Sequence, residues 1–309
     1  MDADLTLQFF DTPQPFLDAA GELLAADPVL GSVIASVSQR TARELADGRD
    51  SWVEVDAPFE RWWVVVRDAS GEVVSAVMRT APFKPYPSFS MPLPEPAARA
   101  LAAALHERGE VLGGANGALP GAAVLARSTA ELAGGEVVTN KATRLWEATS
   151  VDVPPAPEGR LRQAAEDDAD LVLVWFEAFH AEADEQAGRE PDPASAEHNT
   201  LDSVLVRIRE GVEWLWELPD GTIAHLTGSG LPAYGVGRIG PVYTPKEFRG
   251  RGIASYVVGE LTRRGLEAGH RMCLFTDRAN PTSNKIYAGL GYEPAVDMAE
   301  HLVVVPGMP

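Results

Sequence analysis

Hydrophobic and polar positions along the chain follow two periods, and the stretch from 236 to 269 shows both. An apolar run over 236–243 is typical of a strand, and a short polar loop follows it. Ile253, Val257 and Leu261 then recur at four-residue spacing, which places them on one face of a helix. Gly269 is a suitable end for that helix. The pattern predicts a strand, a loop and an amphipathic helix in that order.

The same periodicity, with Gly and Pro as punctuation, predicts elements in both halves of the chain. In the first half the predicted helices cover 15–26, 28–46, 96–108 and 120–132, and the predicted strands cover 61–67, 72–80 and 137–149. In the second half the predicted helices cover 168–182, 194–210, 250–268 and 281–289, and the predicted strands cover 161–163, 212–218, 222–229, 236–243, 271–276 and 295–305.

The order of elements therefore occurs twice, which indicates a large internal repeat. Each half runs helix, helix, hairpin, loop, helix, Pro-led helix and strand. Residues 151–160, VDVPPAPEGR, carry three prolines and read as an extended, semi-rigid linker. We predict two domains, 1–150 and 161–309, joined by this linker.

Composition narrows the class of protein and its partners. The chain has 309 residues, 45% of them hydrophobic, and a formal net charge of −19. That charge argues against nucleic acid and anionic membranes as partners. No apolar run approaches the ~20 residues that span a bilayer, and the acidic N-terminus does not resemble a secretory signal. The single cysteine, Cys273, lies in an apolar strand and excludes an intrachain disulfide. We expect a cytoplasmic protein.

The loop before the helix at 253 carries the strongest chemical signal. A helix N-terminus has unpaired N–H groups and partial positive charge. Gly250 and Gly252 would let a ligand approach the backbone, and Arg249 and Arg251 add full positive charge. These residues predict a site for a phosphate or pyrophosphate. The alternative is an ordinary basic surface loop at a helix start.

Two motifs resemble the GNAT-fold N-acetyltransferases. Arg249-x-x-Gly252-x-Ala254, after a strand and before a helix, resembles the acyl-CoA pyrophosphate loop of that superfamily. Asn280 to Tyr287, followed by Leu-Gly-Tyr at 290–292, resembles its second signature. The close resemblance covers about 212–294. It implies an α/β (α+β) fold of two tandem GNAT-like domains, each a mixed, mostly antiparallel sheet flanked by helices.

The resemblance also implies roles for residues of the second half. The strand around 240–244 would splay from its neighbour, and the backbone of Val242, Tyr243 and Thr244 would hold the pantetheine arm of acetyl-CoA. The pyrophosphate would lie on Arg249, Gly250, Arg251, Gly252, Ile253, Ala254 and Ser255. Asn280 and Asn284 would hydrogen-bond the CoA arm, and Tyr287 would be the general acid toward the CoA sulfur. Tyr287 has the alternative of a core tyrosine.

The general base is left open. Glu177, Glu217 and His225 interrupt apolar stretches, but each is equally explained as a solvent-facing residue, and a water chain would also serve. His180 and His198 show no ligand spacing with carboxylates or with Cys273, and we predict no metal.

The first half lacks the acyl-CoA motifs at the aligned positions. Leu93-Pro94-Glu95-Pro96 stands where the second half has 249–254, and these prolines remove donors while Glu95 adds the wrong charge. Leu119, Ala123 and Ala126 stand in place of Asn280, Asn284 and Tyr287. We predict one working site, in the C-terminal copy, and a degenerate N-terminal copy.

These observations predict an acetyl-CoA-dependent N-acetyltransferase that acts on a primary amine of a small molecule or peptide by direct transfer. The first alternative is a non-catalytic acyl-CoA-binding regulator. The second, from the tandem arrangement alone, is an acetyltransferase that resembles mycothiol synthase. The acceptor, the length of the acyl group and a homodimer are left open.

Overall fold

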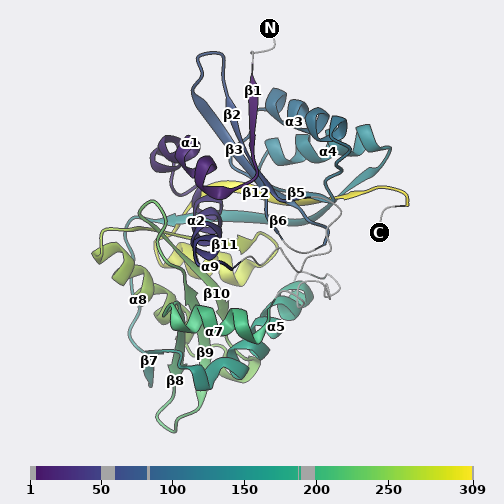
Figure 1. Ribbon diagram of the computed structural model, residues 1–309. Coiled ribbons are helices and arrows are strands. Elements are labelled where there is room, and N and C mark those ends of the chain that lie inside the picture. Colours follow the sequence, from purple (N-terminus) through teal and green to yellow (C-terminus); the bar gives the residue numbers. More distant parts are fainter. Residues whose placement is uncertain (1–4, 50–59, 82–83, 187, 189–198, 308–309) are drawn as a thin grey trace. The chain divides into compact units, whose positions relative to one another are not determined.

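The chain folds into two compact units in the computed structural model (Figure 1). The structure describes residues 5–49, 60–81, 84–186, 188 and 199–307. Unit 1 comprises Met1–Arg144 and Ala295–Pro309, and unit 2 comprises Leu145–Pro294.

Unit 2 carries every predicted site residue and is built on a mixed sheet. Its strands are the end of β6 (Glu136–Ala148), β7 (Arg160–Gln163), β8 (Glu213–Glu217), β9 (Ile223–Ser229), β10 (Val236–Tyr243) and β11 (Arg271–Asp277), in the order β6-β11-β10-β9-β8-β7. Its helical segments are η1 (Glu166–Asp168), α5 (Ala169–Gln186), α7 (Leu201–Arg209), η2 (Lys246–Phe248), α8 (Ile253–Glu267) and α9 (Pro281–Gly289). β10 and β11 are parallel. The other pairs, β7 with β8, β8 with β9 and β9 with β10, are antiparallel.

Helices cover both faces of this sheet because its strands are apolar on both sides. On one face, α5 and α7 pack on Leu215, Leu226 and Tyr243. On the other face, α8 and α9 pack on Trp216 and Ile239. Successive residues of a strand point to opposite faces, so β10 contributes to both cores at its end.

β10 separates from β11 part-way along its length. The parallel pairing runs from Val236 opposite Arg271 to Ile239 opposite Leu274, and β10 then continues only beside β9. A bulge between Ile239 and Val242 accompanies the divergence. The backbone of β10 beyond Ile239 is therefore turned away from β11, as the predicted splay requires.

Unit 1 repeats the plan with β1 (Thr6–Phe10), β2 (Trp62–Arg67), β3 (Val73–Arg79), β4 (Ser88–Ser90), β5 (Gly114–Ala118), β12 (Glu293–Val304) and the first part of β6, in the order β1-β2-β3-β4-β5-β12-β6. Its helices are α1 (Pro13–Ala26), α2 (Ser32–Ala46), α3 (Glu95–Glu107) and α4 (Gly121–Ala133). β4 and β5 are the parallel pair, as β10 and β11 are in unit 2.

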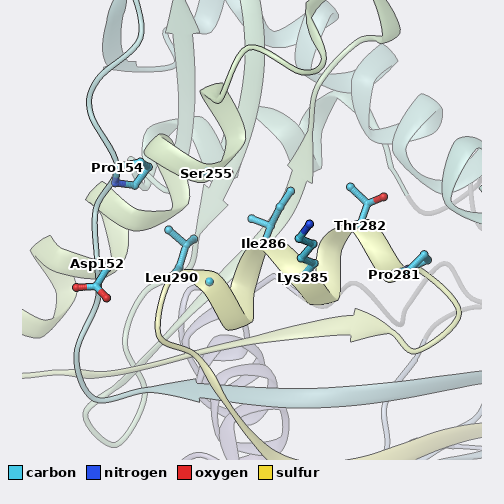
Figure 2. A pocket seen from close by; sticks show the side chains of 9 residues that line it. Asp152, Pro154, Ser255, Pro281, Thr282, Lys285, Ile286 and Leu290 are labelled. Atoms are coloured by element: carbon cyan, nitrogen blue, oxygen red, sulfur yellow. The ribbon is translucent and has the colours of Figure 1, made fainter.

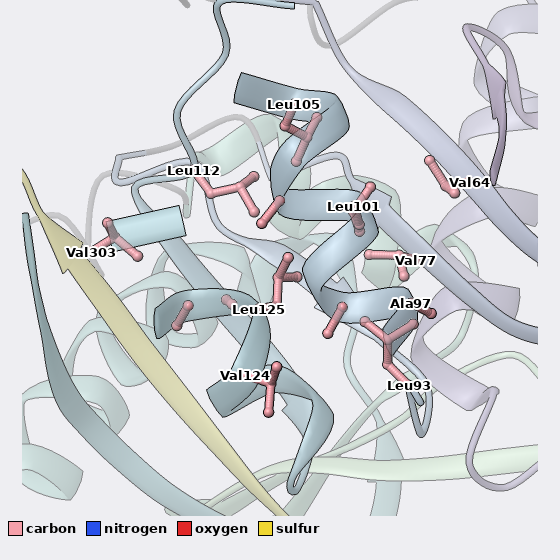
Figure 3. Close-up of a cluster of buried hydrophobic side chains, with 14 of the residues drawn as sticks. Val64, Val77, Leu93, Ala97, Leu101, Leu105, Leu112, Val124, Leu125 and Val303 are labelled. Atoms are coloured by element: carbon pink, nitrogen blue, oxygen red, sulfur yellow. The ribbon is translucent and has the colours of Figure 1, made fainter. Parts of the chain in front are cut away.

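The main core of unit 1 lies between α3, α4 and the sheet. Figure 3 shows Leu101 and Leu105 of α3 packed with Val124 and Leu125 of α4, and Val64 of β2 belongs to the same cluster. All five side chains are almost fully removed from water. The two helices thus pack directly on each other.

The structure confirms the fold class and corrects two details, while a third lies partly outside the described residues. Strands β1, β4 and β5 were not predicted, because each is short or rich in glycine and flanked by proline. The predicted domain 161–309 included the last strand, but residues 295–309 group with unit 1, where β12 pairs antiparallel with β5. The start of the helix predicted over 194–210 lies outside the described residues, and α7 begins at Leu201.

Candidate active site

The N-terminus of α8 is open to a ligand. Gly252 is its N-cap with φ +78°, and Gly250 has φ +74°, both in the left-handed region that favours glycine. The cap makes no side-chain hydrogen bond to the helix, and a Cβ at either glycine would meet no atom within 4 Å. The first N–H groups of α8 consequently face free space, with the positive end of the helix dipole behind them.

A cavity of about 670 Å³ lies at this helix end. It is bounded by the end of β10, the loop 248–252, the starts of α8 and α9, and one side of α5. The structure brings all the predicted site residues into its lining except Asn284. The residues that were predicted and line it are Val242, Tyr243, Thr244, Arg249, Gly250, Arg251, Gly252, Ile253, Ala254, Ser255, Asn280 and Tyr287.

Tyr287 lies on α9 and lines this cavity. Its side chain is 7% exposed, and its ring meets Tyr292 edge to face with centroids 6.1 Å apart. Burial raises the pKa of Tyr287 above the ordinary value of 10.0, so the phenol stays protonated at neutral pH. The residue is both a core tyrosine and a lining residue, and a protonated hydroxyl is what a general acid needs.

Arg249 is held by two partners at the edge of the cavity. Its Nε donates to the backbone oxygen of Thr244 at 2.8 Å, and its terminal nitrogen forms an ion pair with Glu182 of α5. Glu182 also accepts a hydrogen bond of 3.0 Å from the hydroxyl of Tyr243. Burial and the neighbouring Glu182 raise the pKa of Tyr243 to about 12, which keeps that hydroxyl a donor. Arg249 has five N–H donors, so it retains capacity for a phosphate.

The side chains of Asn280 and Asn284 make hydrogen bonds at the start of α9 and to the end of β11. The side chain of Asn280 is the N-cap of α9 and accepts from the N–H of Ser283 at 3.1 Å. Asn284 accepts from Thr276 at 2.6 Å and donates to the backbone of Asp277 and Arg278. These bonds attach α9 to the end of β11. They place Asn284 outside the cavity lining, which differs from the expected contact with the CoA arm.

A second cavity, of about 690 Å³, adjoins the first between α8 and α9. Figure 2 shows it between Asp152 and Pro154 on one side and the side chains of α9 on the other, and we call it the α8–α9 groove. It shares Ser255, Pro281, Thr282 and Ile286 with the first cavity. The exposed Lys285 is the cation in its lining. The segment predicted as a linker therefore forms one wall of a groove in unit 2.

None of the three candidate bases lines the cavity. Glu177 is exposed on α5, and Glu217 pairs with Arg160 and Arg162, which lowers its pKa. His225 is fully buried on β9, and burial lowers its pKa to about 3.

His225 instead supports a residue of the cavity. Its ring nitrogens lie 2.7 Å from the hydroxyl oxygen of Thr244 and 2.6 Å from that of Thr227. The neutral imidazole therefore fixes the side chain of Thr244, which lines the cavity. This is a positioning role and was not foreseen. Of the histidines considered as ligands, His180 packs against Phe179, and His198 lies outside the described residues.

Sequence reasoning also missed Glu182 and Phe179, which line the cavity from α5. Neither belongs to a motif, and only the packing of α5 against β10 brings them there. α5 also carries other acidic and aromatic residues, such as Glu177 and Trp175, so the sequence alone does not single these two out.

The aligned region of unit 1 is filled by its own backbone. β4 is only Ser88–Ser90 and pairs with β5 over its whole length, up to Ser90 opposite Gly117. A Cβ at Gly121 would lie 2.3 Å from the backbone oxygen of Leu93, which shows how closely the loop before α3 packs on the start of α4. Glu95, in the first turn of α3, pairs with Arg99 of the same helix. This packing supports the predicted degeneracy of the N-terminal copy.

Comparison with known proteins agrees with this arrangement. Residues 216–301 match the FR47-like protein family. A GCN5-related N-acetyltransferase from Sphaerobacter thermophilus superposes with a TM-score of 0.53 at 19% identity, covering 98% of this chain and 97% of that chain. A GNAT-family acetyltransferase from Colwellia psychrerythraea gives 0.51 at 11% identity, covering 97% and 99%.

A tandem GNAT protein from the clavulanic acid biosynthesis pathway gives a TM-score of 0.51 at 14% identity, covering 99% of this chain and 100% of that chain. The chain is a tandem GNAT-fold protein. No curated protein sequence matches it. The predicted GNAT fold and its tandem arrangement are thus confirmed.

No described helix is both long and apolar enough to cross a membrane. Within the same residues, no group of three or more His, Cys, Asp or Glu side chains is placed to hold a metal ion.

Proposed function

We propose that unit 2 transfers an acetyl group from acetyl-CoA to a primary amine of a small molecule or peptide, within a complex that holds both substrates. One observation carries the proposal. The open N-terminus of α8, the free edge of β10 and the hydroxyl-bearing Tyr287 line one cavity. Together they offer an anion site, backbone groups for an extended chain and a proton donor.

Each part of acetyl-CoA has a matching surface. The pyrophosphate suits the unpaired N–H groups of α8, with Arg249 and Arg251 beside them. The pantetheine arm suits β10 beyond Ile239, where pairing with β11 has ended. Pro241 has no N–H, so Val242 or Thr244 would donate to the thioester carbonyl. The adenosine part suits the α8–α9 groove, where Lys285 would meet the remaining phosphate.

The transfer step needs little from the protein beyond placement. The ammonium form of the substrate first loses a proton to water, and the uncharged amine then attacks the carbonyl carbon. A C–N bond forms, the C–S bond breaks, and the nitrogen releases a second proton to water. The sulfur leaves with the electron pair and takes the proton of Tyr287, whose burial keeps it protonated. The phenolate recovers a proton from solvent as CoA leaves.

A mixed-amine assay tests the proposal. Purified protein is incubated with acetyl-CoA and a panel of primary amines and peptides, and free thiol and N-acetylated product are measured together by absorbance and mass spectrometry. We expect equal amounts of both with at least one amine, and their loss in Tyr287→Phe. Binding of acetyl-CoA with no transfer across the panel would favour the regulator instead.

A further inference from the structure

Residues from both faces of the sheet of unit 2 line the cavity. Val242 packs with the core under α8, whereas Tyr243, the next residue, packs with the core under α5 and α7. Both line the cavity. Because successive strand residues point to opposite faces, the cavity passes through the sheet where β10 has left β11.

We call the part of the cavity lined by α8 the α8 mouth and the part lined by α5 the α5 mouth, and the two differ in chemistry. The α8 mouth carries open amides, Arg251 and the glycines, which suit phosphates. The α5 mouth carries two aromatic rings, Phe179 and Tyr243, with the carboxylate of Glu182 between the helix and the strand. A donor that lies along α8 and reaches through the gap presents its thioester to the α5 mouth, where the acceptor must then lie.

Glu182 has unused acceptor capacity. One oxygen accepts from Tyr243 at 3.0 Å, and the other pairs with Arg249. A carboxylate has about four lone-pair positions, so roughly two remain. The Glu182 side chain is 17% exposed, which leaves it partly desolvated and strengthens a charged hydrogen bond.

We propose that Glu182 is the acceptor-binding residue, and that it selects a primary ammonium ion whose body is apolar or aromatic. The ammonium donates to Glu182, and the body lies against Phe179 and the ring of Tyr243. Aromatic faces attract a cation as well as apolar carbon. This inference rests on the proposed function and adds to it the substrate class and the residue that recognises that substrate.

The coupling to the donor follows from charge. Arg249 and Glu182 form a neutral pair in the free protein. A pyrophosphate beside Arg249 makes the group negative overall, so the amine site gains affinity for a cation once the donor is in place. Replacing Glu182 by Gln removes an anion near the phosphates and will leave CoA binding equal or tighter.

The test uses phenethylammonium as the probe, titrated by calorimetry into protein saturated with CoA, which prevents turnover. The variants are Glu182→Gln and the matched control Glu185→Gln, since Glu185 lies one turn away on α5 in an exposed pair with Lys246. We expect Glu182→Gln to lower the affinity for the probe by about 10-fold to 100-fold, because one charged hydrogen bond is lost. Glu185→Gln will match the unaltered protein.

Two further measurements separate recognition from structural damage. The uncharged analogue 2-phenylethanol will bind weakly and equally to the unaltered protein and Glu182→Gln, because it does not use the charge. Phe179→Leu will weaken phenethylammonium by about 2- to 5-fold through loss of the ring face. Retained CoA binding shows that each variant is folded.

The outcomes distinguish failure of this inference from failure of the proposed function. If CoA binds but phenethylammonium does not bind, or binds equally to Glu182→Gln and Glu185→Gln, Glu182 is not the ammonium site while the proposed function stands. If Glu182→Gln fails to fold, Phe179→Leu decides, and an unchanged affinity overturns the inference. If CoA itself does not bind the unaltered protein, the proposed function fails and this inference fails with it.

Discussion

Gly252→Glu is the most direct perturbation of the proposed phosphate site. Gly252 has φ +78° at the start of α8, and a Cβ there meets no atom within 4 Å. Gly269, after the end of the same helix, has φ +82° and equally open surroundings. The same substitution at the two positions therefore brings similar backbone strain and the same charge, but only one of them is beside the cavity.

The two effects have separate magnitudes. A side chain in the left-handed region costs roughly 1–2 kcal/mol, so both variants will lower Tm by about 2–8 °C. A carboxylate ~4 Å from a phosphate charge repels it by between about 1 kcal/mol in water and about 4 kcal/mol near a protein surface. We therefore expect Gly252→Glu to weaken acetyl-CoA by about 100-fold.

The assay is calorimetric titration of acetyl-CoA into both variants, with thermal unfolding as the measure of strain. Because the effect is electrostatic, the difference between the variants will narrow as salt rises. The reasoning is refuted if Gly252→Glu is folded and binds acetyl-CoA within about threefold of Gly269→Glu at low salt.

Three other predictions concern single residues. Tyr287→Phe will lower kcat by about 100-fold with little change in the KM for acetyl-CoA, as steady-state rates with a reactive amine will show. In the folded protein His225 is neutral, with a pKa of about 3, whereas in the unfolded chain it binds a proton below pH 6.5. Its contribution to the free energy of unfolding is therefore complete above pH 6.5 and falls by about 1.4 kcal/mol per pH unit below it. Urea unfolding will show a flatter pH profile in His225→Gln. Gly121→Ala will destabilise the protein by about 1–3 kcal/mol in the same assay, because its methyl group meets the Leu93 backbone, and acetyl-CoA affinity will stay unchanged.

Periodicity predicted the long elements well and the short ones poorly. The helix predicted over 250–268 is α8 at Ile253–Glu267, and the helix predicted over 281–289 is α9 at Pro281–Gly289. β4, only Ser88–Ser90, lies in a proline-rich segment where neither period can be detected. The grouping of 295–309 with unit 1 depends on pairing with β5, a long-range contact that local pattern does not encode.

The site was predictable where a motif reports backbone conformation. Gly250 and Gly252 both need positive φ, and a short motif encodes that requirement directly. Side chains that act through tertiary contacts were not predictable. Asn284 accepts a hydrogen bond from Thr276 at the end of β11, and Glu182 reaches the cavity from α5. Both depend on packing between different elements of the fold.

Counting acetyl-CoA sites tests the central claim most directly, since the claim is one working site in unit 2 and a filled counterpart in unit 1. Acetyl-CoA is titrated by calorimetry into the unaltered protein at known concentration. We predict one site per chain, and its loss in Gly252→Glu. Two sites per chain would contradict the degeneracy of unit 1, and no binding at millimolar acetyl-CoA would contradict the donor site itself.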